Sequence, residues 1–345
     1  MKKILMFQDY FYMGGIEKVI SDIKNNLNIL YDIDILSFVN KSNYNIISLL
    51  NKDYKNFLIR NILGIYKLNK YLKNNKYDII HIHCYNSFGL IYAILSYKYN
   101  KNIIIHAHNS NIDKDYLYIK HIINNIIKFI FKSNKYKYVA VSESCNKFCF
   151  NNKNCLIIPN GVDYSKYKFK NIDRIKYRKL FNIKDSDIVI GHIGRFEIQK
   201  NHEFIINLFS KLKNNYKLIL IGEGSLKEKI ICQINELNLD SRVIILDNRN
   251  DINKLINMFD IFVFPSFYEG FPLCLIENQI NGKYVFASNN IDKCTKISNR
   301  IKYLDLDINI WVNEIENIKE NKFKLDNNLD IKEYINKIKD IYEKS

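Results

Sequence analysis

Two glutamates frame a short apolar and turn-forming segment in the last third of the chain. The segment is FYEGFPLCLIEN, residues 267–278, and it carries Glu269 and Glu277 eight positions apart. A carboxylate near buried surface is costly unless it is paired or used. Pro272 suits the first position of a helix, which puts Glu269 in a loop and Glu277 about a turn and a half into that helix. Both carboxylates can then accept hydrogen bonds from a hydroxyl-rich ligand.

Backbone amides at the start of this helix would complete such a site. The first amides of a helix have no acceptor within it and attract negative charge. We therefore expect the free amides of Phe271, Leu273 and Cys274 to surround a ligand site between the two carboxylates. Gly270, Phe271, Pro272 and Leu273 are the expected lining residues. An alternative interpretation makes Glu277 a buried structural carboxylate paired with Lys or Arg.

A second group of candidate residues is suited to binding an anion. GHIGRFEIQKN, residues 191–201, follows a predicted strand and carries Arg195 and Lys200, which can converge on one anion around a turn. IGEGS follows another predicted strand and carries Gly222 and Gly224, where the backbone can come close to a ligand. Together they predict a diphosphate site. Surface solvation of the cations and a tight turn at the glycines are the alternative.

Two further glycines lie between the first predicted strand and the helix that follows it. They are Gly14 and Gly15, in MGGIEKV. Helix-start amides that are open to close approach attract a phosphate. The pattern is not GxGxxG, so the dinucleotide-binding fingerprint is absent, and two glycines on their own also make an ordinary turn.

Four histidines form two pairs at the ends of adjacent strand candidates. The pairs are His81 with His83 and His106 with His108. Positions i and i+2 of a strand face the same side, so four imidazoles can cluster. No Cys, Asp or Glu has zinc-ligand spacing nearby, and no metal site is predicted. We expect His108 to face a ligand crevice while the others pack or form hydrogen bonds.

The elements that must position these residues alternate along the chain. Continuous Ile, Val and Leu runs are typical of strands buried on both faces of a parallel sheet, and helical patterns separate them. The series occurs twice and predicts an α/β fold with two doubly wound domains. The expected strands are KKILMFQ, IDILSFV, KNFLI, YDIIHIH, NIIIHAH, KYVAVSE, CLIIPNG, DIVIGHIG, YKLILIGE, RVIILD, IFVFPS, KYVFAS and IKYLDL.

The 345 residues exceed the usual single core, and we expect three segments. These are a first domain over 1–170, a second over 171–327, and a C-terminal helix over 328–345 that packs back toward the first domain. No stretch approaches the roughly 18 apolar residues of a spanning helix. MKKILMFQDY predicts a first strand rather than a signal peptide, and seven irregularly spaced cysteines fit reduced thiols. A cytoplasmic protein is expected.

The positive charge is concentrated in the first half of the chain. Of a net charge of +16, residues 1–170 contribute 25 Lys/Arg against 11 Asp/Glu, and residues 171–345 contribute 27 against 25. This predicts an anionic partner: a phosphate-bearing substrate, an acidic membrane surface or nucleic acid. Solubility and codon bias are the alternative. Residues 114–137 fit a basic amphipathic helix on an anionic bilayer as well as they fit an ordinary packed helix.

The motifs occur in an order that resembles the retaining glycosyltransferases of family 4, the glycosyl transferases group 1, which have the GT-B fold. The matching segments run from residue 14 to residue 278, and as an ordered set they are highly specific. They are GGIE, HAHNS, VAVSE, IPNGVD, IGRFEIQKN, IGEG and PSFYEGFPLCLIEN. The resemblance implies two Rossmann-like domains facing a central cleft, with the acceptor in the first and a nucleotide-sugar in the second.

The resemblance also implies roles for the donor-site residues. Arg195 and Lys200 match the residues that hold the donor diphosphate. Glu269 and Glu277 match the ends of the family's E-x7-E motif, in which the first carboxylate contacts sugar hydroxyls and the second binds the ribose. Fixed cations and amides stabilise a departing nucleoside diphosphate without a metal ion. The D-x-D triplets Asp32/Asp34, Asp113/Asp115, Asp185/Asp187 and Asp305/Asp307 all lie outside the inferred cleft.

Two residues of the first domain match the family as well. Gly15 would let the first helix approach the diphosphate, and His108, with His106 as the second choice, matches the histidine near the reacting sugar. The chain departs from the family at Asp247, where Gly is frequent, and at Asn278, where Ala is common.

The resemblance implies a hexosyltransferase of the EC 2.4 class. It would move a hexose or N-acetylhexosamine from a UDP-linked donor to a glycan or polyprenyl-diphosphate-linked acceptor in surface polysaccharide synthesis, with retention and without a cofactor. Its place would be the cytoplasm, at the inner face of the membrane. A nucleotide-sugar epimerase of GT-B fold is the alternative enzyme. Nucleic-acid binding driven by the charge is disfavoured, because no basic, aromatic-interleaved recognition module is apparent.

Overall fold

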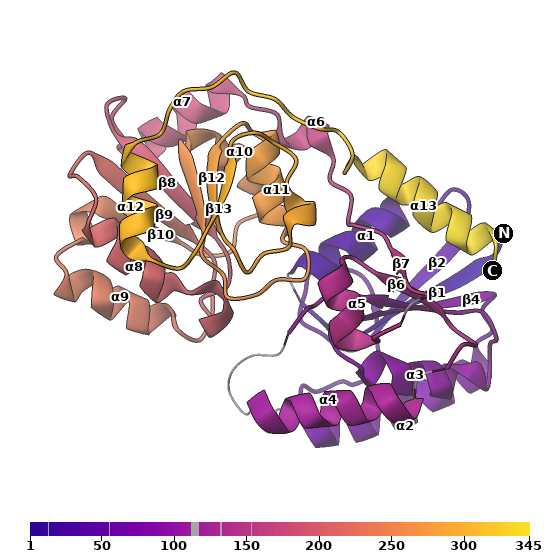
Figure 1. Ribbon diagram of the computed structural model, residues 1–345. Helices are drawn as coiled ribbons and strands as arrows, with labels where there is room; N and C mark the ends of the chain where they lie inside the picture. The colour runs from indigo at the N-terminus through magenta and orange to yellow at the C-terminus, as the bar shows by residue number, and fades with distance from the viewer. Residues whose placement is uncertain (13, 55, 112–116, 132, 153) are drawn as a thin grey trace. The chain divides into compact units, whose positions relative to one another are not determined.

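The computed structural model in Figure 1 describes residues 1–12, 14–54, 56–111, 117–131, 133–152 and 154–345. The chain divides into two units, Met1–Gly161 with Ile331–Ser345, and Val162–Asp330. Asp113 and Asp115, one of the D-x-D triplets, lie outside the described residues, as does the beginning of the segment 114–137.

A parallel sheet forms the centre of the first unit. Within the described residues its strand order is β3-β2-β1-β4-β5-β6-β7. Helices cover both faces of the sheet (Figure 1), so strand residues such as Ile4, Leu5 and Met6 are fully buried. The elements of this unit are β1 Lys3–Phe11, α1 Gly15–Leu27, β2 Asp32–Asn40, β3 Ile47–Ser48, α2 Phe57–Asn74, β4 Ile79–Cys84, α3 Phe88–Tyr97, β5 Ile103–Ala107, α4 Leu117–Phe131, β6 Lys137–Ala140, α5 Glu143–Cys149, β7 Leu156–Ile157 and α13 Ile331–Glu343.

The helices of this unit lie in two layers. On one side of the sheet α1 packs against α13, and on the other α3 packs against both α2 and α4 (Figure 1). Helix α13 buries Tyr334, Ile338 and Tyr342, so the C-terminal helix forms part of the core of the first unit. Among the described helices, none is both long and apolar enough to cross a membrane.

One predicted strand, KNFLI at residues 55–59, is wrong. Phe57 is the first residue of α2, and the Asn56 side chain caps it by accepting hydrogen bonds from the amides of Leu58 at 2.9 Å and Ile59 at 3.2 Å. The cap satisfies amides that have no acceptor inside the helix. The strand beside β2 is instead β3, whose two residues are too few to give a periodic signal.

The second unit has a parallel sheet of the same kind. Within the described residues its strand order is β10-β9-β8-β11-β12-β13, which reverses between β8 and β11. The elements are α6 Tyr164–Tyr167, α7 Asn171–Leu180, β8 Ile188–Ile193, η1 Ile198–Lys200, α8 His202–Ser210, β9 Tyr216–Ile221, α9 Lys227–Glu236, η2 Asp240–Arg242, β10 Val243–Leu246, α10 Ile252–Leu255, η3 Ile256–Met258, β11 Ile261–Phe264, α11 Leu273–Ile280, β12 Tyr284–Ser288, η4 Lys293–Thr295, β13 Ile301–Leu304 and α12 Ile308–Glu316.

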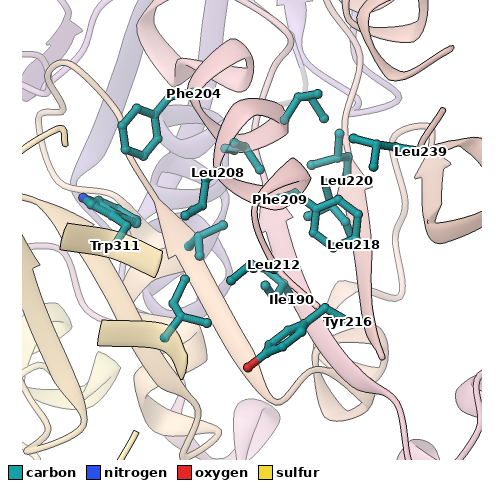
Figure 2. Close-up of a cluster of buried hydrophobic side chains, with 14 of the residues drawn as sticks. Ile190, Phe204, Leu208, Phe209, Leu212, Tyr216, Leu218, Leu220, Leu239 and Trp311 are labelled. Carbon is teal, nitrogen blue, oxygen red and sulfur yellow. The ribbon is translucent and has the colours of Figure 1, made fainter. Parts of the chain in front are cut away.

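A hydrophobic core fixes this second sheet against α8 and α12. Figure 2 shows Phe209 of α8 beside Leu218 and Leu220 of β9, and Phe204 of α8 near Trp311 of α12 in the same cluster. The Phe204 and Trp311 rings meet edge to face, with centroids 5.2 Å apart. Aromatic pairs of this geometry add to the free energy gained by burying their surface. The packed layer holds the ends of β8, β9 and β11 in fixed positions.

Residues 162–170, which the sequence places with the first domain, belong to the second unit. The Tyr164 hydroxyl donates to Asp326 O at 2.9 Å, and Asn281 Nδ2 donates to Tyr167 O at 2.7 Å. The chain therefore passes from one unit to the other after Gly161 and again after Asp330.

Candidate active site

The reversal of strand order in each sheet marks where a ligand is expected. In open α/β sheets ligands bind beyond the carboxyl ends of the strands, at the point where the order reverses. In the second unit this point lies between β8 and β11. The loops that leave these two strands carry most of the residues singled out in the sequence.

An ion pair joins the loop after β8 to the loop after β11. Lys200 Nζ lies 2.6 Å from Glu269 Oε1, and the side chains are only 13% and 10% exposed. The sequence predicts separate ligands for these residues, a phosphate and a sugar, whereas in the structure they contact each other. Their charges balance inside a largely buried site.

Hydrogen bonds between the same two loops set the geometry of this pair. The Phe267 amide donates to Gln199 O at 2.9 Å, and Gln199 Nε2 donates to Tyr268 O at 2.9 Å. Asn201 Nδ2 donates to Pro265 O at 3.3 Å. These bonds lie on both sides of Lys200 in the sequence, so the ammonium group is held against Glu269 by the backbone around it.

The charged residues of this site affect the pKa of the nearby Cys274 thiol. Burial raises the pKa of its thiol to about 12; nearby Lys200 opposes that rise in pKa, whereas Glu277 and Glu269 add to it. The thiol donates to Ile193 O at 3.5 Å, at the end of β8. One cation and two carboxylates are thus close enough to act on a single, partly buried thiol.

Helix α11 follows the loop after β11 and carries Glu277. It begins at Leu273, with Pro272 as the residue before it, one position from the expected start. Glu277 is 5% exposed, and Gly270, Phe271, Pro272 and Leu273 are also buried. The first amides of α11 have no acceptor within the helix, and their partial positive charge favours an anion.

The glycines after β9 support the loop after β8. A Cβ at Gly222 would lie 2.2 Å from Gly194 O, and one at Gly224 would lie 2.5 Å from Phe196 O. The Gly222 amide donates to Leu246 O at 2.9 Å, so it already has an acceptor within the sheet. These glycines therefore permit a close approach between two backbone segments.

Arg195 lies on the loop that these glycines support. It sits between Gly194 and Phe196, and its side chain is exposed. The Phe196 amide donates to Glu223 O at 2.9 Å, which fixes the backbone next to Arg195. The structure thus brings Arg195 and Lys200 onto one loop, five residues apart, with Lys200 turned inward and Arg195 outward.

Gly14 and Gly15 lie at the start of α1, in the first unit. Gly14 is the residue before the helix, and a Cβ there would meet Glu17 Oε2 at 2.7 Å. Glu17 is buried and accepts a hydrogen bond from Gln8 Nε2 at 2.6 Å. A Cβ at Gly15 would meet no atom within 4 Å, so the surface beside the first residue of α1 is open.

The four strand-end histidines cluster, as the i, i+2 spacing predicts. β4 and β5 pair in parallel with His83 opposite His106, which brings all four imidazoles to one face of the sheet. His83 Nδ1 lies 2.9 Å from His108 Nε2. Burial lowers the pKa of His108 to about 3, so its ring is neutral at physiological pH.

A buried acidic residue near the end of β1 is absent from the residues that the sequence singles out. Asp9 is 7% exposed and accepts hydrogen bonds from the hydroxyls of Tyr85 at 3.2 Å and Tyr92 at 3.3 Å. Burial raises the pKa of its carboxyl, and Arg60 opposes that rise. Asp9 lies beside the point where the strand order of the first sheet reverses, between β1 and β4. The available signal was an acidic residue directly after the predicted strand KKILMFQ.

Comparison with known proteins agrees with this geometry. The family model described as Glycosyltransferase Family 4 matches residues 13–166, and the one described as Glycosyl transferases group 1 matches residues 173–299. An Escherichia coli enzyme named UDP-Gal:alpha-D-GlcNAc-diphosphoundecaprenol alpha-1,3-galactosyltransferase is 25% identical over 329 residues, covering 83% of this chain and 80% of its own.

Two further similarities cover most of the chain. The capsular polysaccharide biosynthesis glycosyltransferase CapH of Staphylococcus aureus is 25% identical over 295 residues, which is 80% of each protein. The crystal structure of HepE from Anabaena with UDP and glucose superposes with a TM-score of 0.81 over the full length of both chains, at 18% identity. Both units have the matching fold, and both family models belong to one kind of enzyme. The chain is therefore a glycosyltransferase that belongs to family 4, the glycosyl transferases group 1, and has the GT-B fold.

Proposed function

We propose that this glycosyltransferase moves a hexose or N-acetylhexosamine from a UDP-linked donor to a polyprenyl-diphosphate-linked glycan during surface polysaccharide synthesis, with retention of the anomeric configuration. The observation that carries the proposal is the Lys200–Glu269 pair beside buried Glu277 at the carboxyl edge of the second sheet. The name of the Escherichia coli relative, with a UDP-sugar donor and a diphosphoundecaprenol acceptor, supports the choice of substrates, as does the UDP bound to HepE.

The donor site offers a reason why the bond to the leaving group can break. A nucleoside diphosphate gathers negative charge as it departs, and fixed cations and amides stabilise that charge without reorganising. Lys200, Arg195 and the first turn of α11 would supply them. Glu269 would accept hydrogen bonds from the donor sugar, and Glu277 from the ribose. No metal ion at the diphosphate is needed for this chemistry.

In the proposed mechanism, Lys200 and Glu269 pair with each other before the donor binds and contact the donor afterwards. Before the donor binds, each charge satisfies the other at low exposure. When the donor arrives, its phosphate oxygens become additional acceptors for Lys200 and its sugar hydroxyls become donors to Glu269. The pair thus places the positive and negative groups of the site at the junction between diphosphate and sugar.

The acceptor is proposed to bind the first unit, at the carboxyl edge of its sheet. His108 directly follows β5 and Asp9 lies near the end of β1, at that edge, where acceptor hydroxyls would find a neutral imidazole and a buried carboxyl. Gly15 would leave room for a phosphate beside α1.

The donor is identified by measuring thermal stabilisation with UDP, GDP, ADP and CMP and with their sugars. A ligand that binds only the folded protein raises its melting temperature. We expect UDP and one UDP-sugar to do so, and Arg195→Ala to lose most of the shift. Lys217→Ala is the matched control, because this lysine lies near the amino end of β9, at the opposite edge of the sheet.

Transfer is then assayed with that sugar and a polyprenyl-diphosphate glycan. The linkage formed should have the anomeric configuration of the donor, as read by NMR. Productive conversion of the donor without any acceptor would identify an epimerase and overturn the proposal. So would full retention of the thermal shift in Arg195→Ala.

We further propose that the first unit docks on an anionic bilayer. Exposed apolar side chains follow a four-residue spacing on α2, at Leu58, Ile62 and Tyr66. Exposed Lys70 continues that spacing, and exposed Lys67 follows Tyr66 directly. Helix α4, which packs beside α3 and covers most of segment 114–137, exposes Phe129 to 91%. Apolar residues rimmed by lysines suit insertion at an acidic lipid surface.

Co-sedimentation with vesicles tests this docking. Vesicles containing phosphatidylglycerol should pellet the protein at low salt, and pure phosphatidylcholine vesicles should not. Ile62→Ser with Phe129→Ser should reduce binding at least fivefold, whereas Ile310→Ser, an exposed apolar residue of the second unit, should not. Unchanged binding in the double variant, or concentration-dependent dimers that account for the exposed surface, would refute the proposal. Donor stabilisation is measured in parallel, since it does not depend on the bilayer.

A further inference from the structure

Three histidines of the first unit form a cluster with the composition of a metal site. His81 and His83 lie two apart on β4, and His106 lies opposite His83 on β5. Their ring centroids are 4.1 Å apart for His81 and His83, and 5.4 Å apart for each of the other two pairs. The three side chains are at most 1% exposed. One nitrogen from each ring lies within 4.8 Å of the others.

The nitrogens of this cluster are incompletely satisfied. Within the residues that the structure describes, Nε2 of His81, Nε2 of His83 and both nitrogens of His106 are buried without a hydrogen-bond partner. Buried polar atoms in native proteins almost always have a partner, and an exception calls for a bound water or ion. Four such atoms on one face of two adjacent strands therefore indicate a ligand that accepts several imidazole lone pairs at once.

Neighbouring side chains favour lone pairs that face one another. His81 Nδ1 lies 2.8 Å from the hydroxyl of Tyr342, and His83 Nδ1 lies 2.9 Å from His108 Nε2. With a proton on each Nδ1, these contacts leave Nε2 of both rings as the lone-pair nitrogen. Metal-binding histidines use their second nitrogen in this manner, and the partner fixes both tautomer and ring orientation.

We propose that His81, His83 and His106 bind a divalent first-row transition-metal ion, with Zn²⁺ as the ion to test. Zinc holds imidazole nitrogens at about 2.0–2.1 Å, which separates them by about 3.3 Å in a tetrahedral site. The present nitrogens lie within 4.8 Å of one another, so binding the ion requires the side chains to rotate toward a common centre. Three neutral imidazoles suit zinc, copper and nickel better than magnesium or calcium, and water would occupy the fourth position.

The electrostatic setting is compatible with such an ion. Burial lowers the pKa of His81 to about 3 and holds the pKa values of His83 and His106 well below their ordinary value, and the neighbouring imidazoles lower them further. The rings are therefore neutral near pH 7 and need not release protons to bind a cation. The ion would tie β4 to β5 and, through Tyr342, to α13. This role is independent of the donor site.

The experiment uses the full chain, produced without a histidine tag in zinc-supplemented cells. Elemental analysis should find one zinc per chain, and X-ray absorption should show imidazole nitrogens at about 2.0–2.1 Å. His106→Phe and His81→Phe should each lower zinc content at least tenfold. His202→Phe is the matched control, because this buried histidine of the second unit also has two nitrogens without a partner in the described chain. It should keep the zinc.

Tyr342→Phe separates metal binding from simple packing. It removes only the hydroxyl beside His81, so the chain should fold and still bind one zinc, with affinity reduced about 10- to 100-fold in competition with a chelator. Near-ultraviolet circular dichroism checks the fold of each variant. Zinc below a tenth of an equivalent in the wild-type chain, an absorption spectrum without imidazole, or zinc content unchanged in His106→Phe would each overturn the proposal. The X-ray absorption spectrum of the wild-type chain tests for imidazole-bound zinc even where a histidine variant does not fold.

Discussion

At the scale of single residues, the Lys200–Glu269 pair is the feature that most changes the interpretation of the site. Removing one partner of a largely buried ion pair leaves the other charge uncompensated, which destabilises a protein by about 3–5 kcal/mol. A loss of activity in Lys200→Ala would therefore mix lost donor contact with a disturbed Glu269. Substitutions that keep size and remove charge give a clearer answer.

The two glutamates should differ in which kinetic constant they control. Glu269→Gln should lower kcat at least tenfold with little change in the donor KM, because it acts on the sugar as the bond breaks. Glu277→Gln should mainly raise the donor KM, because a ribose contact is made equally in ground state and transition state. Steady-state kinetics with varied donor measures both constants. Equal or negligible effects in the two variants would contradict this division.

Two glycines should respond to alanine in opposite ways. Gly15→Ala places a methyl group in open space at the start of α1, so the free energy of unfolding should stay the same or rise by up to about 1 kcal/mol. Transfer activity should nevertheless fall, if a phosphate approaches there. Gly222→Ala should destabilise by about 2 kcal/mol or more, because its Cβ meets a carbonyl oxygen and its φ is +150°. Denaturant titration with a parallel activity assay compares them.

Residue types and order predicted much of the site, but not its internal contacts. The strand-end positions of Arg195, Lys200 and Glu269 follow from the runs of Ile, Val and Leu before them. That Lys200 turns toward Glu269 depends on hydrogen bonds such as Gln199 Nε2 to Tyr268 O, which join loops far apart in sequence. No local pattern encodes such a contact. Tyr342 beside His81 is a second example, because the two partners are 261 positions apart in the sequence.

At the scale of elements, long periodic segments were predicted well and short or ambiguous ones were not. GIEKVISDIKNNL has apolar residues at helical spacing, and α1 spans the same thirteen residues. KNFLI contains a continuous apolar run that is equally typical of a buried strand and of a helix beginning. The deciding signal was Asn56, whose side chain caps α2.

Substitutions at Asn56 test how much its side-chain cap stabilises α2. Asn56→Ala should lower the free energy of unfolding by about 1 kcal/mol, because the amides of Leu58 and Ile59 lose their acceptor. Asn56→Asp should retain most of the stability, because its carboxylate can accept the same hydrogen bonds. Urea unfolding followed by circular dichroism gives the comparison. Equal stabilities for wild type and Asn56→Ala would mean that the cap contributes nothing in solution.

At the scale of the whole molecule, buried histidines make the stability depend on pH. Burial lowers the pKa of His192 to about 3 and that of His202 to about 2, from an ordinary value of 6.5. Below pH 6.5 the unfolded chain takes up protons that the folded chain does not. Stability is therefore complete above pH 6.5 and falls as the pH decreases toward the folded pKa values, by about 1.4 kcal/mol per pH unit for each histidine.

The variant His202→Phe isolates the contribution of one buried histidine to the pH dependence of stability. Melting temperatures measured from pH 7.5 to pH 4.5 should fall less steeply for His202→Phe than for the wild-type chain, because phenylalanine can stack on Phe196 as the imidazole does and has no proton to gain. The two curves should run parallel above pH 6.5. A variant whose curve follows the wild-type curve throughout would show that His202 is not buried neutral in solution.

The route of the chain between its two units has a consequence for biosynthesis. The first unit is interrupted after Gly161 and resumes only at Ile331, and the returning segment supplies Tyr342 to its core. Domains generally fold as units while the ribosome proceeds from the amino end. Here the second unit, Val162–Asp330, is synthesised in full before the first can close. A premature stop codon among the last fifteen codons would therefore leave the second unit complete. It would remove part of the first unit, although synthesis of that unit began first.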